Sequence, residues 1–157
     1  MKMSKPDPFV DAAQGAASQI AALCWRMHKG RVQILLITSR DTGRWVIPKG
    51  WPMAGRSSAS AAAREAWEEA GVEGKVHDTP LGTFTYDKLD RTDATLQCAV
   101  DVHPLKVLAL KARFPESHQR RRAWFQVDLA AVLVAEPQLK DLLRRVEADP
   151  GLLRSPA

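Results

Sequence analysis

The stretch that decides the fold of this chain is REAWEEAGV, residues 64–72, which places three glutamates on one predicted helix. At about 100° per residue, Glu65, Glu68 and Glu69 lie within about 100° of one another, so their carboxylates converge on one side. Arg64 can pair with Glu68 one turn away, but Glu65 and Glu69 repel each other. The spacing alone fits either a solvated acidic stripe or carboxylates gathered around a hard cation such as Mg²⁺.

The sequence on either side of this helix predicts an α/β sandwich with a mixed sheet. Strong helix formers fill Ala59–Ala70, and Gly71 is the expected C-cap. Two apolar runs, Ser18–Met27 and Val32–Thr38, are split by residues 28–31 and predict a β-hairpin. Further strands are predicted at Trp45–Ile47, Leu81–Tyr86, Thr95–Val102 and Ala123–Val127, and further helices at Asp128–Leu133, with Asp128 as the N-cap, and from Pro137 to about Glu147.

The length and composition indicate one globular domain. The chain has 157 residues, of which 45% are hydrophobic and 26% charged, and this is an ordinary balance for a folded protein. We expect a flexible N-terminal tail at 1–16, a domain at 17–150 and a C-terminal tail at 151–157. The apolar runs are shorter than the roughly 18 residues needed to span a bilayer, and the first residues lack the apolar stretch of a signal peptide. We therefore expect a cytoplasmic protein that does not bind a membrane.

The net charge of the chain indicates the kind of partner it binds, and the positions of its two cysteines indicate whether they bind a metal. A formal net charge of +5 favours an anionic partner, either a polyphosphate or a nucleic acid. Cys24 and Cys98 lie in apolar, strand-like contexts without the spacing of a zinc site, so we expect buried free thiols.

The residues before the helix complete a longer pattern. Gly50 is followed by five residues, Arg56, seven residues and then REAWEEAGV. This resembles the Nudix box, G-x5-E-x7-R-E-U-x-E-E-x-G-U, in which U is a bulky aliphatic residue. Ala66 is a small substitute for the first aliphatic residue, and Val72 fills the last position. The resemblance overrides the reading of the glutamates as a solvated stripe.

The resemblance implies a Nudix fold, an α/β/α sandwich, and hydrolysis of a pyrophosphate linkage. In that family the glutamates of the box bind a divalent cation, so it implies that Glu65, Glu68 and Glu69 bind Mg²⁺, or Mn²⁺ in its place, together with the carbonyl of Gly50. Such a cation would neutralise the substrate phosphates and position the attacking water. Either Glu65 or Glu69 could accept the proton of that water.

Arg56 departs from the box, where the family has a glutamate that usually pairs with the arginine matching Arg64. Two explanations are open. Either a neighbouring acid holds Arg64 and Arg56 turns toward substrate phosphates, or the loop is weakened and activity falls.

Further segments are similar to a subgroup of the family, the diphosphoinositol polyphosphate phosphohydrolases and their bacterial relatives, which also hydrolyse diadenosine polyphosphates. The similarity implies a small-molecule polyphosphate substrate. These segments are TSRDTGRWVIPKGW at 38–51, GVEGKV at 71–76, LGTFTY at 81–86 and FPESHQRRRAWFQV at 114–127.

Basic residues around the box support that substrate class. Trp51 could stack on a base or pack its own loop, and Glu116 could bind a metal or orient water, or lie exposed at the surface. In the run at 120–122, strand alternation sends the middle arginine away from its neighbours. The predicted phosphate-binding side chains are Arg40, Arg44, Lys49 and Arg56.

Three functions therefore follow from the sequence. The first is a Mg²⁺-dependent hydrolase of diphosphoinositol polyphosphates or dinucleoside polyphosphates. The second is a housekeeping Nudix hydrolase of nucleoside triphosphates or nucleotide sugars. The third is a catalytically silent domain that binds a nucleotide or RNA, although the retained glutamates argue against it and against a nucleic-acid partner. A monomer or a homodimer fits each of them.

Overall fold

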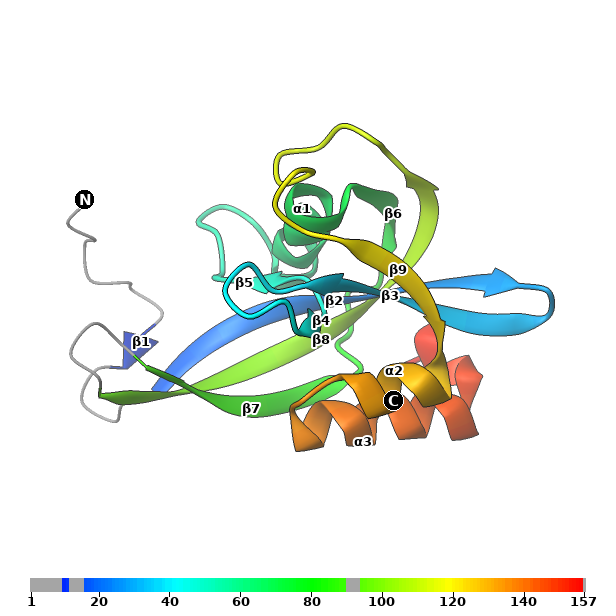
Figure 1. The fold of residues 1–157 in the computed structure, drawn as a ribbon. Helices are drawn as coiled ribbons and strands as arrows, with labels where there is room; N and C mark the ends of the chain where they lie inside the picture. Colours follow the sequence, from blue (N-terminus) through cyan, green and yellow to red (C-terminus); the bar gives the residue numbers. More distant parts are fainter. Residues whose placement is uncertain (1–9, 12–15, 90–93, 157) are drawn as a thin grey trace.

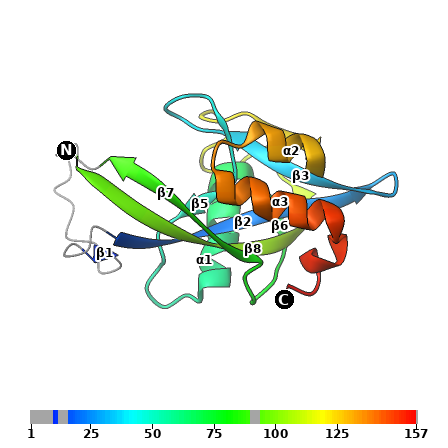
Figure 2. The same ribbon diagram turned by 90° about the horizontal axis from the view of Figure 1, so that it is seen from below.

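The computed structural model describes residues 10–11, 16–89 and 94–156. A sheet forms the middle layer, with helix α1 on one face and helices α2 and α3 on the other (Figure 1; Figure 2). Most of the predicted N-terminal tail, 1–16, lies outside the described residues. No helix in the described part of the chain is both long enough and apolar enough to cross a membrane.

The sheet is mixed, as predicted. Strands β2 and β8 run in parallel, and the other pairings among the described strands are antiparallel. The order is β4-β3-β2-β8-β6, with β1 and β5 paired to β2, β7 to β8, and β9 to β3. The strands are β1 (Val10–Asp11), β2 (Ala16–His28), β3 (Arg31–Thr38), β4 (Trp45–Val46), β5 (Lys49–Gly50), β6 (Val72–Val76), β7 (Gly82–Leu89), β8 (Thr95–Leu110) and β9 (Arg122–Gln126).

The predicted hairpin is present between β2 and β3. Its two-residue turn consists of Lys29 and Gly30, which both have positive φ, at 51° and 79°. A turn of this kind matches the twist of the flanking strands and fixes the register, in which His28 lies opposite Arg31.

Strand β8 is longer than predicted. The alternating pattern predicted a strand that ends at Val102, yet the strand continues to Leu110 through Pro104, which cannot donate to a ladder. Over Thr95–Val102 its antiparallel neighbour is β7, and from Leu105 onward it is β6. Pro104 lies where one neighbour replaces the other, so the strand tolerates it.

Helix α1 (Ser58–Ala70) matches the predicted helix almost to the residue. The Ser57 side chain accepts a hydrogen bond from the Ser60 amide at the N-terminus, and Gly71 ends the helix in the left-handed conformation with φ of 67°. The buried face consists mainly of Ala59, Ala61, Ala62, Ala66 and Ala70, which pack with residues of β2, β3 and β6.

Helices α2 (Val127–Leu133) and α3 (Pro137–Ala148) cover the other face of the sheet. The prediction that Asp128 is the N-cap of α2 is wrong, because Gln126 holds that position and Asp128 lies in the first turn. The predicted C-terminal tail, 151–157, begins inside a short 3-10 helix, η1 (Pro150–Leu153), whose Leu153 is buried in the core. Both cysteines are free and buried, as predicted.

Candidate active site

A cleft of about 670 Å³ opens beside the N-terminal half of β2 and the loop that follows β3. Its wall consists of the β3–β4 loop, β5 and the loop after it, one side of α1, part of β7 and the β8–β9 loop. Five basic and five acidic side chains line it: Arg40, Arg44, Lys49, Lys88, Arg120, Asp41, Glu65, Glu69, Asp87 and Glu116.

Glu65 and Glu69 form the acidic part of the cleft. They lie one turn apart on α1, and their side chains share a hydrogen bond. Strand β5 brings Gly50 so close to Glu65 that a β-carbon at position 50 would overlap the Glu65 carboxylate. A larger residue at position 50 would therefore displace the Glu65 carboxylate from this place.

Burial controls the protonation of this pair. It raises the pKa of Glu69 to about 8, and the hydrogen bond with Glu65 adds to the rise. Burial also raises the pKa of Glu65, while its hydrogen bond with Glu69 opposes that rise. Near neutral pH, without a cation, the pair shares a proton that Glu69 donates to Glu65.

Glu68, the third glutamate of the box, does not line the cleft. Its Oε1 lies 2.8 Å from Nε of Arg64, so the pair predicted from the sequence is confirmed. Among the described residues, no three His, Cys, Asp or Glu side chains form a ready-made cation site. Of the four predicted metal ligands, the structure thus brings Gly50, Glu65 and Glu69 together in the cleft and leaves Glu68 outside it.

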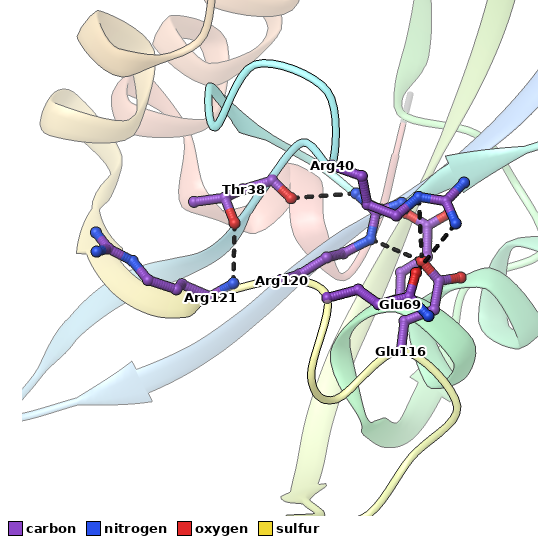
Figure 3. Close-up of polar contacts among 7 residues, drawn as sticks. Thr38, Arg40, Glu69, Glu116, Arg120 and Arg121 are labelled. Carbon is purple, nitrogen blue, oxygen red and sulfur yellow. Dashed lines mark hydrogen bonds and ion pairs between the residues drawn. The ribbon is translucent and has the colours of Figure 1, made fainter.

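Arg120 connects Glu69 to the predicted extra acid, Glu116 (Figure 3). Its side chain is only 10% exposed; Nη2 lies 3.7 Å from Oε1 of Glu69 and Nε donates to Oε1 of Glu116 at 2.9 Å. Its Nη1 donates to the carbonyl of Thr38 at 3.1 Å. The Arg121 side chain points away from this network, as predicted, but Arg120 and Arg121 precede β9, so strand alternation is not the cause.

Of the predicted phosphate-binding residues, all but Arg56 line the cleft. Arg56 is exposed, and its Nη1 donates to Oγ of Ser60 at 3.1 Å. Burial lowers the pKa of Lys49, and the charges of Glu69 and Glu136 oppose that change. Lys49, Arg40 and Arg44 thus remain as the candidates for binding phosphate, and Trp51 also lines the cleft.

The sequence analysis missed Gln19, Tyr86 and Glu136. The Tyr86 hydroxyl donates to Oε1 of Gln19 at 2.6 Å, and Nζ of Lys49 lies 5.0 Å from the centre of the Tyr86 ring. Glu136 lies beyond Tyr86, at the start of α3, where Nη1 of Arg44 is 3.9 Å from its Oε1. An acid directly before a helix-starting proline is the only local signal for Glu136, and that signal also fits an ordinary helix cap.

Comparison with known proteins shows which protein family this chain resembles in sequence. The family model described as NUDIX domain matches residues 17–146. Human diphosphoinositol polyphosphate phosphohydrolase 3-beta is 33% identical over 117 residues, which cover 73% of this chain and 67% of that protein. Nudix hydrolase 16, mitochondrial, from Arabidopsis thaliana is 32% identical over 115 residues, covering 71% of this chain and 63% of that protein.

Solved structures show the same fold at lower identity. The Ap4A hydrolase of C. elegans superposes with a TM-score of 0.60 at 19% identity, over 83% of this chain and 96% of that one. A NUDIX hydrolase from Nitrosomonas europaea superposes with a TM-score of 0.62 at 19% identity, over 83% of this chain and 88% of that one.

Proposed function

The chain belongs to the Nudix family of hydrolases, and on that premise we propose that it hydrolyses a pyrophosphate bond in a dinucleoside polyphosphate or a diphosphoinositol polyphosphate, with Mg²⁺ or Mn²⁺ bound at Glu65 and Glu69. The observation that carries the proposal is the pair Glu65 and Glu69 inside the cleft, where Glu69 is buried and the half-buried Glu65 lies against Gly50. The names of the similar proteins support the two substrate classes.

The residues of the cleft fit a hard divalent cation. Two adjacent carboxylates that take up a proton when no cation is present offer the oxygen ligands that Mg²⁺ prefers. The backbone of Gly50 lies beside one of them and can add its carbonyl. Glu68 can join this set only if its side chain leaves Arg64.

The other side chains suit the reaction by position and charge. A bound divalent cation neutralises phosphate oxygens and acidifies a water molecule. Glu69, which Arg120 holds in place, can accept the proton of the attacking water. Arg40, Arg44 and Lys49 can donate to the non-bridging phosphate oxygens. The substrate would be a small molecule, which either a monomer or a homodimer can bind.

Incubation of the purified protein with candidate substrates, followed by chromatographic separation of the cleavage products, tests this function. Diadenosine tetraphosphate, a diphosphoinositol polyphosphate, ATP and a nucleotide sugar would each be incubated with Mg²⁺, with Mn²⁺ and with excess EDTA. We expect turnover of at least one of the first two substrates, abolished by EDTA. Turnover that survives EDTA, or that is confined to ATP or the nucleotide sugar, would overturn the proposal.

A further inference from the structure

The carboxylate of Glu136 has an unmet hydrogen-bonding capacity. Its side chain is 11% exposed. Among the buried side-chain oxygens and nitrogens of the described residues, Oε2 of Glu136 is the one without a hydrogen-bond partner. The residue occupies the N-cap position of α3, yet its side chain does not cap the helix. A buried acceptor without a donor is unfavourable, so this oxygen is poised to accept a donor from elsewhere.

Glu136 lies next to the cleft. It lines a side pocket of about 430 Å³ that shares Arg44, Tyr86 and Asp87 with the cleft, so the two spaces are adjacent. The Glu136 charge also acts on Lys49 inside the cleft. A substrate that places its phosphates near Glu65 can therefore extend its remaining part toward Glu136.

The charge at this end does not favour a phosphate-rich group. The cleft itself holds equal numbers of basic and acidic side chains, and Glu136 adds a further acid beside Arg44. Arg44 is about half exposed and lies 3.9 Å from Glu136, beyond a good hydrogen bond. It is thus able to turn toward a phosphate, and this movement would uncover the carboxylate.

We propose that Glu136 determines substrate specificity by selecting substrates whose non-reacting end is an uncharged nucleoside over substrates whose non-reacting end is a phosphate-bearing ring. This inference rests on the proposed function and selects one of its two substrate classes. The hydroxyl and amino groups of a nucleoside supply the donor that Oε2 lacks. Ring phosphates are mostly ionised at neutral pH and so offer few donors, and a buried carboxylate repels them.

Binding measurements test the inference independently of turnover. The affinities of ADP and of inositol hexakisphosphate would be measured by calorimetry in Mg²⁺ for the wild type and for Glu136→Lys. We expect the wild type to bind ADP more tightly. In Glu136→Lys, ADP binding should weaken about tenfold, the value of one charge-assisted hydrogen bond, while inositol hexakisphosphate binding strengthens.

Asp141→Lys is the matched control because it makes the same charge change on the exposed side of α3. It should leave the ratio of the two affinities unchanged. Glu136→Gln keeps the shape of the side chain. It should shift the ratio of the ADP and inositol hexakisphosphate affinities about threefold, in the same direction as Glu136→Lys. It replaces the lysine variant if that variant unfolds.

Two results would overturn the inference: tighter binding of inositol hexakisphosphate than of ADP by the wild type, or equal ratios in Glu136→Lys and Asp141→Lys. Hydrolysis of diadenosine tetraphosphate by the same samples reports separately on the proposed function. A protein that shows the Glu136 effect but does not hydrolyse diadenosine tetraphosphate would contradict the function and support the binding preference.

Discussion

Helices α1 and α3 cover opposite faces of one sheet but contribute to the protein in different ways. The buried face of α1 consists of alanines and Glu69, whereas that of α3 consists of Leu139, Leu142, Leu143 and Val146. Each buried leucine or valine adds about 1.5–3 kcal/mol of hydrophobic stabilisation, and an alanine adds far less. Small side chains instead let α1 approach the sheet and bring Glu65 against Gly50. We infer that α3 mainly supplies stability and α1 mainly supplies the site.

The largest expected effect is on turnover, at α1. Glu69→Gln keeps the shape of the side chain but removes its negative charge, so kcat should fall about 1000-fold, or roughly 4 kcal/mol. Without divalent cation, Tm near neutral pH should change little, because the Glu69 carboxyl of the wild type is already protonated there. Steady-state kinetics and thermal unfolding measure the two quantities.

Glu73→Gln is the control for this change, because Glu73 lies half exposed on β6, away from the cleft. It should keep wild-type kcat. Full activity in Glu69→Gln would show that Glu69 of α1 takes no part in the reaction. It would contradict the inference that α1 mainly supplies the site.

The next effect is on stability, at α3. Leu143 is fully buried, so Leu143→Ala should reduce the free energy of unfolding by about 3 kcal/mol while kcat/KM of the folded protein is retained. Denaturant titration measures the loss. Leu108→Ala, at a side chain that is 61% exposed, should change the free energy by less than about 0.5 kcal/mol. A large loss of kcat/KM in Leu143→Ala would show that α3 also shapes the site.

A third effect concerns the pH dependence of the protein without divalent cation. Because the pKa of Glu69 is raised from 4.5 to about 8 in the folded state, the protonated carboxyl favours folding at low pH. That contribution is complete below pH 4.5 and is lost as the pH rises toward 8, on the order of 2 kcal/mol. Thermal unfolding in EDTA should therefore show a falling Tm across this window.

Two comparisons sharpen this result. Added Mg²⁺ should restore Tm at pH 8, because the cation takes the place of the proton. Glu69→Gln should show a flatter pH profile than the wild type. An equally steep decline in that variant would assign the pH dependence to another group.

The smallest expected effect is on KM, at Arg56, which precedes α1 and lies outside the cleft. If Arg56 bound a substrate phosphate, which is one of the two explanations that the sequence leaves open, Arg56→Glu would raise KM about tenfold. Since Arg56 lies outside the cleft and bonds to Ser60, we now expect less than a threefold change. Arg40→Ala, inside the cleft, should give the tenfold rise instead. A tenfold rise in Arg56→Glu would extend the substrate contacts beyond the observed cleft.

Local signals in the sequence located most of the fold. The turn at Lys29 and Gly30, the alanine-rich helix and its Gly71 cap depend on neighbouring residues and were predicted correctly. Strand β6 was missed because its middle residues are exposed and do not alternate with buried ones. The length of β8 could not be predicted, because the tolerance of Pro104 depends on which strands lie beside it.

The candidate site was predictable only where its residues lie close together in sequence. Helical spacing placed Glu65 and Glu69 together and predicted the ion pair of Arg64 with Glu68. Only the structure shows that Glu68 lies outside the cleft. Arg120 and Glu136 reach the cleft from distant segments, and only tertiary structure brings them there. The roles of all these residues in metal or substrate binding stay predictions.

The parallel pairing of β2 with β8 has a consequence for how the protein folds. It joins segments that are far apart in the chain, from Ala16 with Gln97 to Trp25 with Lys106, across the whole of α1. Closing so long a loop is slow compared with forming the β2–β3 hairpin or the helix itself. During synthesis, the glutamates of α1 therefore emerge from the ribosome well before Arg120 exists to hold them. The cleft between α1 and the β8–β9 loop should be among the last parts of the molecule to form.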